Sequence, residues 1–249
     1  MDPTTKDLAV ASEASYDESQ TPENYNRLND LSSDNISVYK HKVEPHSIIA
    51  HRGTDIGATK ATKQIKADVA ILFGNKSHDK LHKERVKETE RIVKSLKEAN
   101  PDHKIFLTGH SLGGSTAHNA IVKSEIVRKN VDELHTFNAG TSPLQSKGLG
   151  KRNKAYKEIA SKSTHHAVQG DSISASVKSN LIGKHILYKA PEEKASVGRT
   201  ILRLAKPHLE KSPLGRLVHF GAEKLLDTLS SHSLSNFTAG ASPPARPPP

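Results

Sequence analysis

One short stretch of the chain carries residue types that could perform nucleophilic catalysis. The sequence reads Gly109-x-Ser111-x-Gly113 where an apolar run gives way to a helical pattern. A serine on a sharp strand-to-helix turn has strained backbone geometry, and flanking glycines let neighbouring backbone approach closely. The helix that follows directs its free N–H groups and its positive dipole end toward the negative oxygen that forms in acyl transfer. The pattern predicts Ser111 as a nucleophile and the backbone N–H of Leu112 as an oxyanion donor.

A serine at neutral pH is a weak nucleophile, so it needs a histidine base and a carboxylate that orients the histidine. Where a nucleophilic serine stands on such a strand-to-helix turn, these partners follow it in the order acid, then histidine. Asp171 follows a short apolar segment and a glycine, which predicts a loop at the same strand edge as Ser111. We therefore predict Asp171 as the acid. The competing acids precede a strand or stand in charged or helical contexts: Asp132, Glu133, Glu158, Glu192, Glu193 and Asp227.

His232 is the predicted base. It follows a helical pattern and precedes the proline-rich end of the chain, so a loop there could bring it to the strand edge. A surface histidine in a loop is the alternative interpretation. The pair His165-His166 precedes Asp171 and breaks the expected order, whereas His110 is adjacent to the serine and points away from its hydroxyl. The other late histidines lie in a predicted strand or a basic helical region: His185, His208 and His219.

A second oxyanion donor is expected from a loop after an earlier strand. The segment His51-Arg52-Gly53-Thr54 follows such a strand. Gly53 would let this loop approach the serine turn, and Thr54 offers both a backbone N–H and a hydroxyl. Arg52 could clamp an anion, but a role in anchoring the loop is the favoured interpretation. The sequence thus predicts an oxyanion hole made by Thr54 and Leu112.

Composition limits the class of protein. The 249 residues suit one domain with tails, and the absence of cysteine excludes disulfides and thiolate metal sites. The net charge of +10 predicts attraction to polyanions. Nucleic acid is not favoured as a partner, because aromatic residues make up only 4% of the chain and no reading motif accompanies the charge. We see no signal peptide and no apolar run long enough to span a membrane, which predicts a soluble, intracellular (cytoplasmic) protein, with peripheral membrane contact left open.

The alternation of apolar runs and helical patterns predicts a mostly parallel sheet with helices on both faces, an α/β-hydrolase architecture. Residues 1–7 are expected to form a flexible N-terminus, 8–238 the hydrolase domain, and 239–249 a disordered proline-rich tail. Residues 17–34 are expected to form a loop with one helical turn near Tyr25. Strands are expected at 36–43, 47–50, 69–73, 104–108, 133–138, 167–168 and 184–188, and helices at 8–16, 79–100, from the serine turn to about 127, and at 151–161.

Taken together, these motifs resemble those of the class 3 lipases, the fungal lipase-like α/β hydrolases. The similar features are the Gly-His-Ser-Leu-Gly-Gly turn, the loop at 52–54, the strand end at 136–140, Asp171 and the late His232. The resemblance implies a serine carboxylic-ester hydrolase that acts on glycerolipids or phospholipids through an acyl-enzyme and needs no metal or organic cofactor. It also implies the same triad and oxyanion donors that the spacing suggests.

Two departures from the family pattern stand out. His51 occupies a position where the family often has an aromatic residue, and 58–67 is mostly Lys, Thr and Ala instead of an amphipathic lid. The segment 196–229 interleaves basic and apolar residues, which is typical either of contact with an anionic membrane or of helices that pack on the sheet with a solvated outer face. The alternative functions are a small-ester esterase, a thioesterase, or a catalytically silent lipase-fold module that binds lipid or protein.

Overall fold

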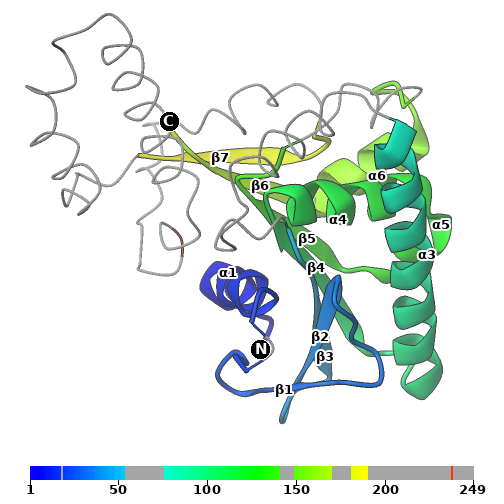
Figure 1. Ribbon diagram of the computed structural model, residues 1–249. Helices are drawn as coiled ribbons and strands as arrows, with labels where there is room; N and C mark the ends of the chain where they lie inside the picture. The colour runs from blue at the N-terminus through cyan, green and yellow to red at the C-terminus, as the bar shows by residue number, and fades with distance from the viewer. Residues whose placement is uncertain (18, 54–75, 141–148, 170–180, 190–236, 238–249) are drawn as a thin grey trace, which may run out of the picture.

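The structure is a computed structural model, which describes residues 1–17, 19–53, 76–140, 149–169, 181–189 and 237 (Figure 1). For residues 76–81 the backbone path is described. The strand expected at 69–73 and the tail expected at 239–249 lie outside the described residues, as does the basic segment 196–229.

A seven-stranded mixed sheet forms the centre of the molecule, and its strands follow one another in sequence order. The first two pairings are antiparallel, and every pairing from β3 to β7 is parallel. The carboxyl ends of β3 to β7 therefore meet at one edge of the sheet. The strands are β1 (Tyr25–Arg27), β2 (Ile36–His41), β3 (His46–His51), β4 (Lys104–His110), β5 (Glu133–Phe137), β6 (Ser163–Val168) and β7 (Lys184–Tyr188).

Helices cover both faces of this sheet, as the sequence predicts. Figure 1 shows α1 on one side of the strands and α3 to α6 on the other. The alternation of side chains along β4 explains both layers: Ile105 and Leu107 pack toward α3 and α4, whereas Phe106 packs toward α1. The helices are α1 (Thr5–Ala14), α3 (Lys76–Ala99), α4 (Leu112–Lys123), α5 (Glu125–Asn130) and α6 (Lys154–Lys162).

Two expectations for the N-terminal part need correction. Helix α1 begins at Thr5, three residues before the expected start at residue 8, because Thr4 and Asp7 form a capping box. It thus crosses the expected boundary between a flexible N-terminus (1–7) and the domain. Around Tyr25 the chain forms strand β1 and not a helical turn, since it pairs with β2. The hydroxyl of Ser12 holds α1 on the sheet through a 2.7 Å hydrogen bond to Thr108.

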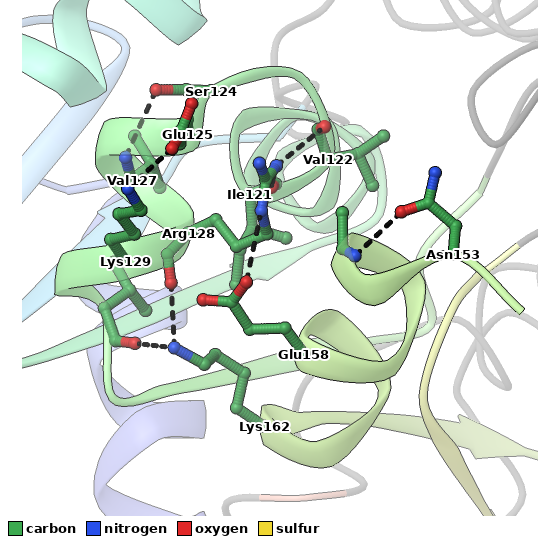
Figure 2. Close-up of polar contacts among 12 residues, drawn as sticks. Ile121, Val122, Ser124, Glu125, Val127, Arg128, Lys129, Asn153, Glu158 and Lys162 are labelled. Atoms are coloured by element: carbon green, nitrogen blue, oxygen red, sulfur yellow. Dashed lines mark hydrogen bonds and ion pairs between the residues drawn. The ribbon is translucent and has the colours of Figure 1, made fainter. Parts of the chain in front are cut away.

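The single helix expected after the serine turn is two helices. Ser124 ends α4 and caps α5, where its hydroxyl accepts the N–H of Val127. Figure 2 shows how the end of α5 is then tied to α6. The Lys162 ammonium donates to the carbonyls of Arg128 and Val131 at 2.8 and 2.7 Å, and so satisfies acceptors that the helix end leaves open. These contacts fix the crossover between β5 and β6.

Candidate active site

Ser111 lies on the turn between β4 and α4, where the sequence predicts it. Its backbone has φ 55° and ψ −123°, a conformation that an L residue adopts only at an energetic cost. The Ser111 N–H donates to the carbonyl of Phe137 at 3.0 Å, which ties the turn to the end of β5. Although Ser111 is the N-cap residue of α4, its hydroxyl makes no capping bond to that helix. The strained turn therefore presents a hydroxyl that the helix does not use.

Three glycines let backbone approach backbone around this turn. A Cβ on Gly113 would lie 2.1 Å from the carbonyl oxygen of His51, and a Cβ on Gly53 would lie 2.6 Å from that of His110. A Cβ on Gly109 would lie 2.5 Å from the carbonyl carbon of Gly113. Real side chains do not tolerate such distances. The first turn of α4 thus rests directly on the chain that leaves β3, which is the close approach that the sequence predicts for Gly53.

The chain that leaves β3 is well anchored. The Arg52 N–H donates to the carbonyl of Asn35 at 2.9 Å, and the Arg52 guanidinium lies 5.9 Å from the centre of the Tyr16 ring. These contacts support the anchoring role for Arg52. Thr54, the predicted second donor, lies outside the described residues. Leu112 is the first residue of α4, so its N–H has no acceptor within the helix. This N–H lies at the N-terminal end of α4, where the helix dipole is positive.

His51 is a structural residue beneath this loop. Its ring is fully buried, with Nδ1 3.0 Å from the Thr116 hydroxyl of α4 and Nε2 3.2 Å from the Thr89 hydroxyl of α3. Burial, together with the nearby charge of Arg85, holds the pKa of His51 well below its usual range. A neutral imidazole therefore bridges two helices at the position where the family often has an aromatic ring.

The carboxyl ends of β5 and β6 are joined by Asn138, a residue that sequence reasoning did not single out. Its φ is 44°, its N–H donates to the carbonyl of His166 at 2.8 Å, and its side-chain oxygen accepts the N–H of Val168 at 2.9 Å. Asparagine tolerates positive φ better than most residues, which explains its presence here. Val168 ends β6 three residues before Asp171. Asp171 itself lies outside the described residues.

Phe237 packs on the same region of the sheet. The ring is buried and lies 5.0 Å from Phe137 and 5.3 Å from Tyr188, both measured between ring centres. Phe137 and Tyr188 are the last residues of β5 and β7. Nothing in the sequence pattern distinguishes Phe237 from other apolar residues near the end. His232 stands five residues earlier and lies outside the described residues.

The described competitors of the predicted triad have structural roles. Asp132 accepts the N–H of Ile105 at 2.8 Å, at the opposite edge of the sheet from Ser111. His165 and His166 are buried in β6, and burial lowers the pKa of His166 to about 3, so both rings are neutral. The Nδ1 atom of His110 lies 3.2 Å from the hydroxyl of Tyr16.

Two further observations concern the described residues alone. They contain no group of three or more histidine and acidic side chains arranged to hold a metal ion. Within the same residues, no helix is both long enough and apolar enough to cross a membrane.

The mixed sheet and the strained serine between β4 and α4 define an α/β hydrolase. The comparisons narrow this class to one family. Residues 48–171 match the family described as lipase (class 3), and the chain belongs to this family. It is therefore an enzyme, a lipase-type carboxylic-ester hydrolase. The comparison with curated proteins gives no significant match.

Solved structures of fungal lipases are similar to this chain. Lipase II from Rhizopus niveus superimposes with a TM-score of 0.51 at 12% sequence identity, over 76% of this chain and 78% of that one. The native propeptide complex of Rhizomucor miehei lipase gives a TM-score of 0.49 at 16% identity, over 76% of this chain and 68% of that one. At 12% identity, the likeness to lipase II concerns the fold alone.

Proposed function

We propose that the protein hydrolyses the carboxylic esters of glycerolipids or phospholipids, with Ser111 as its nucleophile. The observation that carries this proposal is the backbone of Ser111, which holds a strained φ of 55° at the first turn of α4 with glycines packed around it. Strain of this kind persists where the surrounding structure enforces it and is typical of catalytic residues. Membership of the class 3 lipases indicates the ester and lipid chemistry.

In the proposed reaction, the Ser111 hydroxyl oxygen attacks the ester carbonyl carbon while the imidazole of His232 takes its proton. The tetrahedral oxyanion accepts hydrogen bonds from the N–H groups of Leu112 and Thr54. The imidazolium then protonates the leaving alcohol, and an acyl-enzyme forms on Ser111. Water, deprotonated by His232, attacks the acyl group and releases the acid. Asp171 keeps the imidazole in the tautomer and orientation that both steps need.

Two described residues support the choice of Asp171 and His232. Val168 lies at the carboxyl edge that carries Ser111, and Asp171 follows it after three residues, a span of at most about 11 Å. Phe237 packs on the last residue of β5, which pairs with the residue before Ser111. His232 precedes Phe237 by five residues, a span of at most about 18 Å. These short spans from residues near the serine edge of the sheet support the choice of Asp171 and His232.

The decisive experiment compares triad variants with matched controls. Asp171→Asn and His232→Gln are each expected to lower kcat for p-nitrophenyl butyrate by about 10³-fold or more, since triad members act as a unit. The controls are Asp227→Asn and His219→Gln, which change the same residue types in the late part of the chain and should leave kcat within about twofold. Equal activity of Asp171→Asn and Asp227→Asn would exclude Asp171 as the acid.

The substrate class needs a separate measurement. We expect purified protein to release fatty acid from diacylglycerol or phospholipid dispersions in preference to p-nitrophenyl acetate. A preference for the short ester, or for an acyl thioester, would favour a small-ester esterase or a thioesterase. The contact of residues 196–229 with anionic membranes and the intracellular location remain predictions, which vesicle binding and cell fractionation would test.

A further inference from the structure

Arg85 is a buried cation on α3 that the proposed mechanism does not use. Its side chain is only 5% exposed, although it belongs to a helix whose composition is dominated by charged residues. Burying a guanidinium is costly unless hydrogen bonds replace its water. Glu88, one turn along α3, is close enough to favour its charge, but the guanidinium donates to uncharged acceptors. The place of these acceptors indicates what Arg85 does.

Among the described residues, the acceptors belong to Asn35 and Arg52. The Arg85 Nη1 donates to the carbonyl of Arg52 at 2.6 Å and to that of Asn35 at 3.2 Å, while Nη2 donates to the side-chain oxygen of Asn35 at 3.1 Å. The Arg52 N–H also donates to the Asn35 carbonyl. The three residues thus form a closed arrangement at the point where the chain leaves β3. Hydrogen bonds from a charged donor are roughly twice as strong as neutral ones, so the bonds that Arg85 donates are the strongest in this arrangement.

The segment after β3 is held from a second direction by α4. Because Gly113 has no Cβ, the first turn of α4 can contact the His51 carbonyl and the Arg52–Gly53 peptide. A Cβ on Gly113 would lie 2.9 Å from the Gly53 nitrogen. One turn after Arg85, the Thr89 hydroxyl contacts the His51 ring. The backbone of residues 51–53 is therefore held between α3 on one side and the serine turn on the other.

We propose that Arg85 is a positioning residue for ester hydrolysis: it fixes the Arg52 carbonyl and thereby the orientation of the Arg52–Gly53 backbone against the serine turn. This inference rests on the proposed function. It follows that Arg85 stabilises the transition state through the loop and contributes little to ground-state substrate binding. Burial lowers its pKa to about 10, which leaves the guanidinium charged at neutral pH. Its positive charge also has the sign that a developing oxyanion requires.

The test separates transition-state stabilisation from folding and substrate binding. Arg85→Met keeps the length and apolar stem of the side chain but removes every donor. We expect kcat for p-nitrophenyl butyrate to fall about 10- to 100-fold with KM within about threefold, because a displacement near 1 Å can cost about 100-fold in rate. The affinity for a boronic acid, which mimics the tetrahedral anion, should fall by the same factor as kcat/KM.

The control is Arg91→Met, which changes the same residue type six positions along α3. Arg91 is exposed, and its hydrogen bond to the Leu31 carbonyl is long at 3.4 Å, so this variant should retain wild-type kcat and boronate affinity. Arg85→Lys keeps the charge but cannot reach three acceptors at once, so its loss should lie between those of wild type and Arg85→Met. If Arg85→Met does not fold, Arg85→Lys and Asn35→Ala decide the question by the same readouts.

Three results would overturn the inference. A folded Arg85→Met with wild-type kcat would do so, as would a higher KM at unchanged kcat, or a boronate affinity that does not follow kcat/KM. In those cases the wild type still hydrolyses esters, so the proposed function stands. A folded wild type without ester hydrolysis would overturn both proposals.

Discussion

Gly113→Ala is the substitution with the most direct consequence at the serine turn. Glycine is required there because a Cβ would lie 2.1 Å from the His51 carbonyl oxygen and 2.9 Å from the Gly53 nitrogen. Ordinary contact begins at 3.4 Å, so α4 and the chain after β3 must separate by about 1 Å. Neither neighbour is a flexible side-chain end that could turn aside. The first turn of α4 and the Arg52–Gly53 backbone can no longer keep their mutual position.

The expected magnitudes follow from this displacement. Overpacking a close backbone contact costs about 1–3 kcal/mol in the free energy of unfolding. A shift near 1 Å in the groups that hold the oxyanion lowers kcat by about 100-fold. We expect the loss in kcat to exceed what the loss of stability explains, because most of the variant remains folded at 25 °C.

The assay is hydrolysis of p-nitrophenyl butyrate, with urea unfolding of the same preparations. Gly150→Ala is the matched control, since a Cβ at Gly150 would meet no atom within 4 Å. Its kcat and stability should equal those of the wild type. A Gly113→Ala variant whose kcat lies within threefold of the Gly150→Ala value would refute the reasoning that backbone contact at this turn organises the site.

Three other predictions concern the framework. Thr4→Ala removes the capping box of α1 and should lower the free energy of unfolding by about 1 kcal/mol, measured in urea, with an unchanged value counting against the cap. Phe237→Ala opens the contact with Phe137 and should cost about 3 kcal/mol and lower kcat more than stability alone accounts for; full activity would argue against Phe237 as an anchor. Burial lowers the pKa of His118 to about 3 from an ordinary 6.5, so the unfolded chain binds a proton first as pH falls. Stability present above pH 6.5 is therefore lost between about pH 6.5 and 3, at about 1.4 kcal/mol per pH unit, and His118→Gln should show a shallower decline in urea titrations at pH 6, 5 and 4.

Local sequence signals predict much of the parallel sheet. Strand β7 spans Lys184–Tyr188 as expected. Strands β4 and β5 agree with their expected ranges within two residues, because largely buried parallel strands appear as short apolar runs between turn residues. The Ser111 turn is predictable for another reason: glycines on both sides of a serine, where an apolar run meets a helical pattern, are typical of a nucleophile turn. The family match over residues 48–171 includes this turn.

The remaining differences have tertiary causes. Strand β1 has three residues and forms only because β2 offers a pairing edge, which the polar composition of 17–34 does not reveal. Ser124 divides the helix after the serine turn because its hydroxyl caps the next one, whereas apolar periodicity alone continues past it.

Arg85 and Asn138 could not be identified as special from the sequence for a related reason. Arg85 stands among the charged residues of α3, and its burial depends on where α3 meets the end of β3. The positive φ of Asn138 arises from the junction of β5 and β6 and leaves no sequence pattern.

Covalent labelling with a fluorescent fluorophosphonate, followed by peptide mapping, tests the central claim most directly. The wild type should carry the label on Ser111, and Ser111→Ala should carry none, because only a serine activated by a base attacks the phosphorus at neutral pH. Folded wild type that stays unlabelled, or that carries the label on a serine other than Ser111, would contradict the account.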